Sequence, residues 1–82
     1  MPRKIRFLLN KTETLISEHS FRVVEEYNFF DSHDCQERGY FILECECENP
    51  YEIRISTEDG IEYMPSIIED NHVIGWEQVD YI

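Results

Sequence analysis

Cysteine and histidine are the residue types in this chain that could bind a metal ion. Cys45 and Cys47 stand two apart in the stretch FILECECENPYEIRI. The other thiol and imidazole side chains are scattered along the chain: His19, His33, Cys35 and His72. Alternate residues of a strand lie about 6.7 Å apart on one face, which differs from the C-x2-C spacing of structural zinc sites. We therefore expect no metal and no cofactor, and we interpret Cys45 and Cys47 as small apolar core residues.

Catalytic motifs are not indicated by the sequence. Ser32, His33 and Asp34 are the residue types of a hydrolase triad, but three consecutive side chains cannot adopt the relay geometry of such a triad. The chain also contains neither a glycine-rich phosphate-binding loop nor the H-E-x-x-H motif of metalloproteases. We therefore expect a protein that is not an enzyme.

Glutamates alternate with the two cysteines. If Cys45 and Cys47 are buried, then Glu44, Glu46 and Glu48 share the opposite face of the strand. This row is either a solvated outer face or a binding surface. Glutamate is uncommon in strands and like charges in a row repel, so the row lowers stability unless a partner compensates for it. Its spacing of about 6.7 Å is close to twice the rise per phosphate along one strand of B-DNA, about 3.4 Å. We expect acids on flanking elements to extend the same partner-binding surface: Glu52, Glu58, Asp59, Glu62, Glu69 and Asp70.

The net charge favours a basic partner for such a surface. The 82 residues include 18 acidic and seven basic side chains, for a net charge of −11. Residues 1–22 hold five bases and two acids (+3), whereas residues 23–82 hold two bases and sixteen acids (−14). Nucleic acid and anionic membranes attract the opposite sign of charge. We therefore expect binding to a positively charged protein surface, without direct nucleic-acid or membrane contact.

The elements that must position these residues are mostly strands, because the dominant hydrophobic period is two. Alternation is clearest in RKIRFLL, SFRVVEEY, YFILECECE and YEIRIST. We predict a mainly β protein with residues 1–82 forming one compact domain: an antiparallel sheet of about five strands with at most a short helix, or alternatively an α+β fold. Residues 11–20 fit either a strand or a short helix.

The register around the cysteines follows from burial. We predict that residues 40–48 pair with residues 52–57 through a loop at 49–51, because a slip of one residue would place Glu52 on the apolar face. In this register Glu46 faces Arg54 and Glu48 faces Glu52. The two core pairs that result are Cys45 with Ile55 and Cys47 with Ile53.

The start of the chain, MPRKIRFLLN, does not resemble a signal peptide, because Arg6 interrupts its short apolar run. No apolar run is long enough to span a membrane. We therefore expect a cytoplasmic protein whose three cysteines are free thiols. We also expect a monomer.

In length, in the sign of its charge and in the acidic clusters ECECENPYE and STEDGIEY, the chain resembles small acidic inhibitors encoded by phages, above all anti-CRISPR proteins and anti-restriction DNA mimics. This resemblance implies an inhibitor that occupies a basic, nucleic-acid-binding surface of a CRISPR effector in the host cytoplasm. Two other classes remain open: an immunity or antitoxin protein that neutralises a basic nuclease toxin, and a small metal or redox protein that uses its cysteines.

Overall fold

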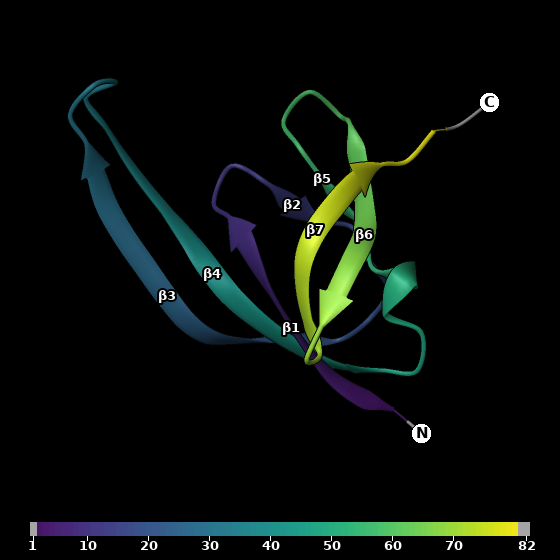
Figure 1. Ribbon diagram of the computed structural model, residues 1–82. Helices are drawn as coiled ribbons and strands as arrows, with labels where there is room; N and C mark the ends of the chain where they lie inside the picture. The colour runs from purple at the N-terminus through teal and green to yellow at the C-terminus, as the bar shows by residue number, and fades with distance from the viewer. Residues whose placement is uncertain (1, 81–82) are drawn as a thin grey trace.

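Seven strands form one sheet in the computed structural model, which describes residues 2–80 (Figure 1). They are β1 (Arg3–Asn10), β2 (Thr14–Leu15), β3 (Phe21–Asp31), β4 (Gln36–Cys47), β5 (Ile55–Ser56), β6 (Glu62–Glu69) and β7 (His72–Gln78). A single 3-10 turn, η1 (Pro50–Glu52), separates β4 from β5. The prediction of a mainly β protein is confirmed, but the sheet has seven strands rather than about five. The ambiguous segment 11–20 contributes the short strand β2 and no helix.

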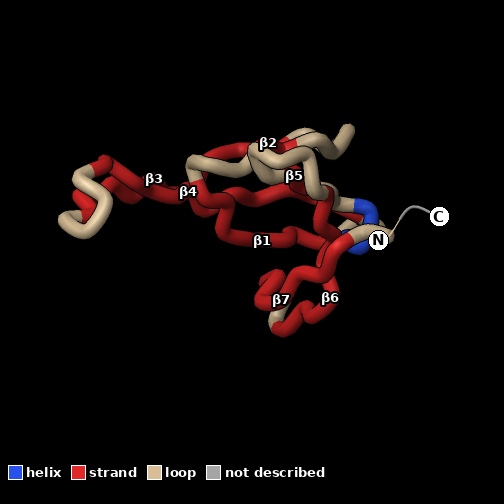
Figure 2. The backbone as a smooth tube through the Cα atoms, turned by 90° about the horizontal axis from the view of Figure 1, so that it is seen from above, coloured by secondary structure: helices blue, strands red, loops and turns tan. Residues whose placement is uncertain are grey.

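The strand order is β2-β5-β6-β7-β1-β4-β3. Neighbouring strands run antiparallel, except that β1 and β7 are parallel, with Arg6 beside His72. The sheet coils around β1, so that β2 and β5 lie on one side of β1 and the β6–β7 hairpin lies on the other (Figure 2). The β3–β4 hairpin extends well beyond the rest of the sheet (Figures 1 and 2). We call residues 25–42 of this hairpin the arm; β1 pairs with its base at residues 40–42.

The predicted pairing of residues 40–48 with residues 52–57 is wrong. β4 instead lies between β1 and β3, and Cys45 is opposite both Ile5 and Phe21. The side chain of Asn49 accepts a hydrogen bond from the Tyr51 amide and caps η1, which turns the chain away from β4. A local hairpin would have paired only a few residues, whereas β1 pairs with β4 along its whole length.

The core lies between β1, β4 and the segment that follows η1. Alternate β1 residues Ile5, Phe7 and Leu9 are buried, as the period-two pattern predicts. Ile53 and Ile55 are also buried in this cluster. The ring of Phe7 makes edge contacts with the rings of Phe21 and Trp76, at centroid distances of 5.3 and 5.5 Å. The aromatic side chains therefore join β1, β3 and β7 in one core.

Cys45 and Cys47 belong to the same core, which confirms that they face inward. They are joined to each other by a disulfide, so the expectation of free thiols is wrong for this pair. Because alternate residues of a strand share a face, the pleat brings their Cα atoms to 6.1 Å, which is within the usual range for a disulfide. Cys35, in the turn of the arm, is exposed and is a free thiol.

Gly39 allows β3 and β4 to approach closely within the arm. It is buried opposite Asn28, and a Cβ atom at this position would overlap with the carbonyl oxygen of Tyr27. We expect Gly39→Ala to lower the free energy of unfolding by about 1–3 kcal/mol, since the backbone of β3 must shift to make room. Urea denaturation followed by circular dichroism measures this loss.

Gly60 provides the matched control for that substitution. It has φ of +82° and no atom within 4 Å of a Cβ position. Gly60→Asn should have a smaller effect, because asparagine tolerates a positive φ better than other side chains. Equal stability of Gly39→Ala and the wild type would contradict the close contact between Gly39 and Tyr27.

Candidate functional site

Glu44 is the first residue of the predicted acidic row. It lies on the face opposite Cys45, as expected, but the expectation that its side chain is exposed is wrong. Its side chain is only 7% exposed, because Arg6 of β1 and Arg22 of β3 cover it from both sides. The register places both arginines directly opposite Glu44. Arg6 Nε donates to Oε2 at 2.8 Å, while Arg22 Nε and Nη2 donate to Oε1 at 3.1 and 2.7 Å.

The hydrogen bonds from Arg6 and then Arg22 lower the pKa of the Glu44 carboxyl to about 2. Glu44 is therefore a fixed anion that links three strands, and its oxygens are already occupied. Arg6 lies between the buried residues Ile5 and Phe7 of β1, whereas Arg22 follows the half-buried Phe21 and precedes the exposed Val23, so only the alternation of β1 signalled this cluster in the sequence. The sequence could not reveal it further, because Arg6 and Glu44 are 38 residues apart.

Glu46 and Glu48 are exposed, as predicted. Glu46 is opposite Lys4 of β1, however, and not opposite Arg54 as we predicted. The basic N-terminal segment therefore lies directly beside the glutamate row. The basic side chains of β1 thus face the acidic side chains of β4, which removes most of the anionic character expected for this face.

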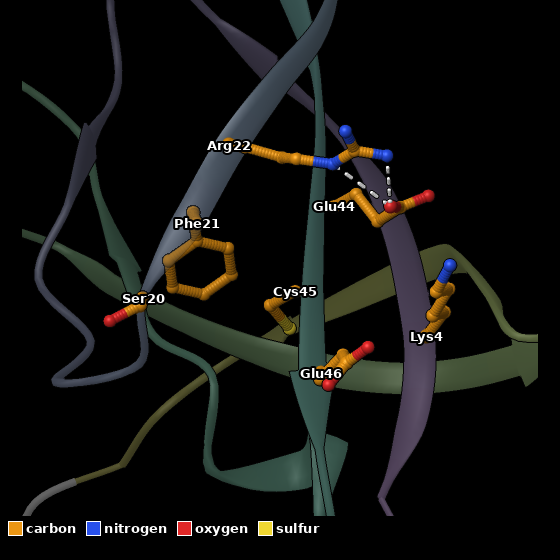
Figure 3. A pocket seen from close by; sticks show the side chains of 7 residues that line it. All are labelled: Lys4, Ser20, Phe21, Arg22, Glu44, Cys45 and Glu46. Atoms are coloured by element: carbon orange, nitrogen blue, oxygen red, sulfur yellow. Dashed lines mark hydrogen bonds and ion pairs between the residues drawn. The ribbon is translucent and has the colours of Figure 1, made fainter.

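A hollow of about 640 Å³ lies at the same place (Figure 3). Figure 3 shows Arg22 reaching from β3 to Glu44 on β4, with Lys4 on the neighbouring strand β1. The charged side chains around the hollow are Lys4, Arg22, Glu44 and Glu46, and Phe21 adds an apolar wall. With two charges of each sign, the hollow has no excess charge that would attract an ionic ligand.

The other predicted site residues do not form one continuous row. Glu52 is exposed on η1, and Glu58 and Asp59 are exposed in the turn between β5 and β6. Glu69 and Asp70 are exposed where β6 turns into β7. These two turns lie at opposite ends of β6. Glu62, at the start of β6, is half-buried.

The uncompensated charge is concentrated after β4. Residues 48–80 contain nine acids and one base, a net charge of −8, whereas residues 1–47 contain nine acids and six bases, a net charge of −3. The single base, Arg54, donates its Nη1 hydrogens to the carbonyl oxygens of Tyr51 and Ile53, at 2.6 and 2.9 Å. We call residues 48–80 the acidic portion. Seven of its nine acids were among the predicted site residues, whereas Glu77 and Asp80 were not.

The histidines and the Ser32-His33-Asp34 stretch take part in turns. His33 N–H donates to Asp31 Oδ1 at 3.0 Å, and His72 Nδ1 lies 2.8 Å from the carbonyl oxygen of Asp70. His19 N–H donates to Ser17 Oγ at 3.3 Å, and its Nδ1 lies 2.7 Å from the same hydroxyl. Such bonds between residues two apart are typical of turns that polar side chains stabilise. Within residues 2–80 no three His, Cys, Asp or Glu side chains are grouped so that they could hold a metal ion.

Comparison with protein-family models, with curated proteins and with solved structures finds no match to this chain. The part of the chain that the structure describes contains no helix of the length and apolarity needed to cross a membrane. The function is therefore inferred from the geometry and the charge distribution of the molecule alone.

Proposed function

We propose that this protein is a non-enzymatic inhibitor that binds a basic surface of a nucleic-acid-handling complex in the host cytoplasm, as anti-CRISPR proteins do. The acidic portion, residues 48–80, makes the contact. A monomer suffices for this role. The inhibitor would block the access of DNA by occupying the surface that normally attracts phosphate groups.

The charge of the acidic portion is the observation that supports this proposal. Nine acids lie there with Arg54 as the only base, and Arg54 is turned towards backbone carbonyls. In residues 1–47, by contrast, Arg6, Lys11, Arg22 and Arg38 form ion pairs with neighbouring acids. A surface with this net charge steers a basic partner toward it and weakens binding to competing anions.

Two pairs of charge reversals within the acidic portion test the proposal. Glu48→Lys with Glu69→Lys changes the residue after β4 and the last residue of β6, and Glu58→Lys with Asp59→Lys changes the turn between β5 and β6. We expect at least one double variant to weaken partner binding by about 2 kcal/mol or more, because attraction is lost and repulsion is added. The isolated variants should melt at the wild-type temperature or higher, since repulsion between acids is relieved. Capture of the partner from host lysate, followed by titration, measures both affinities.

The matched control is Glu18→Lys with Glu46→Lys, which makes the same change in net charge on exposed residues outside the acidic portion. It should keep most of the affinity. Added DNA and higher salt should release the captured complex from the wild type. Capture that is insensitive to salt and to both reversals in the acidic portion would refute the proposal, and a loss confined to the control would assign binding to the surface around Glu18 and Glu46 instead.

The identity of the captured protein separates the inhibitor class from the alternative. An immunity or antitoxin protein would present the same acidic portion to a basic nuclease toxin. A CRISPR effector or another DNA-binding complex in the captured material supports the inhibitor proposed here. A single nuclease whose activity is neutralised in a stoichiometric complex supports the alternative.

A further inference from the structure

β3 is an edge strand, because it stands last in the strand order. An edge strand directs every second N–H and C=O away from the sheet, and proteins usually protect such edges with lysine, proline, bulges or short length. The opposite edge, β2, is only two residues long. β3 has a bulge between Val23 and Glu25, but Glu25–Asp31 then pairs with β4 in regular register. This stretch contains neither lysine nor proline.

The same stretch exposes large aromatic side chains on both faces. Tyr27 and Phe29 alternate on one face and are 45% and 51% exposed, while Phe30 on the other face is 63% exposed. β1 ends at Asn10, opposite Tyr40, so within residues 2–80 no third strand pairs with the outer half of the arm. A two-stranded ribbon is only marginally stable in water, and aromatic side chains on a solvated ribbon are a typical feature of binding surfaces.

The charge of the arm restricts what can bind there. Residues 25–38 contain five acids and one base, Arg38. Lys11, from the turn after β1, is bonded to Glu26. Glu26, Asn28 and Phe30 share a face with Glu37 of β4, where the remaining charge is negative. On the Tyr27 and Phe29 face, Glu25 accepts a hydrogen bond from the Tyr27 hydroxyl and Asp31 is paired with Arg38. A strand added at this edge would therefore find two aromatic side chains between two acids on this face, and Glu26, Asn28 and Phe30 on the other.

We infer that β3 accepts an extended segment of the partner as an additional strand, with apolar and basic residues in alternation. Its apolar side chains cover Tyr27 and Phe29, and its lysine or arginine side chains lie along the face of Glu26 and Glu37. The edge N–H and C=O groups of Glu25–Asp31 form the new ladder. This inference rests on the proposed function only for the sign of the partner's charge, because the arm is separate from the acidic portion.

A second copy of this chain fits the edge less well. Each copy carries a net charge of −11 and each arm has five acids for the one base Arg38, so pairing two arms would bring an excess of acids together. A basic segment of alternating pattern removes that repulsion and satisfies the same backbone groups. Charge complementarity thus selects a basic heterologous strand.

The test uses the full chain, labelled with ¹⁵N, and three synthetic nine-residue peptides with blocked ends. The first alternates valine and lysine, the second alternates valine and glutamate, and the third is the lysine peptide with N-methyl groups along one edge. We expect the first peptide to shift the amide signals of residues 25–31 and to slow the exchange of their edge amides by about tenfold or more. The glutamate peptide should have no effect. The N-methylated peptide keeps its charge but should lose the effect on β3, because it lacks the N–H donors of a strand.

Two variants of similar exposure complete the test. Phe29→Thr keeps a residue that favours strands and should weaken binding of the lysine peptide at least about fivefold. Ile74→Thr, at a side chain that is 59% exposed on β7, should leave the affinity unchanged. A native amide spectrum shows that either variant is folded.

Three results would overturn the inference. The first is an absence of shifts in residues 25–31 at millimolar lysine peptide, and the second is equal shifts with the N-methylated peptide. The third is a dimer of the free chain in sedimentation equilibrium that Phe29→Thr dissociates, since the occupant would then be a second copy. Failure of the proposed function is a separate result, seen as partner capture that does not respond to reversals in residues 48–80.

Discussion

The Ile5→Ala variant should lose about 2–5 kcal/mol of its free energy of unfolding. Ile5 is fully buried in the middle of β1, opposite Cys45, and packs in the core cluster that links β1 to β4. Alanine would leave a cavity that the surrounding strands fill only in part. Small domains are stable by about 5–15 kcal/mol in total, so this one substitution removes a large share. Urea denaturation monitored by the fluorescence of Trp76, which packs on the same core, measures the loss.

Ile74→Ala is the matched control, with the same change of side chain at a residue of β7 that is 59% exposed. It should cost about 1 kcal/mol or less, mainly through the lower strand preference of alanine. Equal losses in the two variants would contradict the assignment of Ile5 to the core.

Glu44→Gln should lower the melting temperature near neutral pH, and the difference from the wild type should shrink on acidification. Arg6 and then Arg22 hold the pKa of the Glu44 carboxyl at about 2, below its ordinary value of 4.5. A carboxyl whose pKa is depressed by folding stabilises the protein above its unfolded pKa. That contribution is lost as the pH falls from about 4.5 toward about 2. Glutamine cannot carry the charge at any pH, so it lacks this contribution throughout.

Thermal melts of the two proteins between pH 7 and pH 2 measure this convergence. Glu46→Gln changes the net charge equally at an exposed residue of the same strand, and should melt close to the wild type at neutral pH. A difference between Glu44→Gln and wild type that stays constant down to pH 2 would contradict the ionic role of Glu44. In that case the loss would reflect packing of the side chain alone.

Local patterns in the sequence determined the type of fold and the inward side of its strands. Alternation in RKIRFLL predicted the buried positions of β1, and alternation in FILECECE predicted that Cys45 and Cys47 face the core. These inferences succeed because the two faces of a strand follow from its own residues. The imbalance of charge along the chain is likewise a property of composition, and the structure leaves it in place after β4.

Only the tertiary structure decided which strands are neighbours, and this changed the interpretation of the glutamate row. The sequence alone favoured a local hairpin around Asn49, but β4 instead pairs with β1 and β3. That pairing buries Glu44 between Arg6 and Arg22, and places Lys4 opposite Glu46. Which strands pair depends on how the apolar faces of strands far apart in the sequence fit together. The residues of one strand alone do not show this. The charges on the outer faces follow that pairing, so the neutralisation of the glutamate row by basic residues emerges only when the strands have assembled.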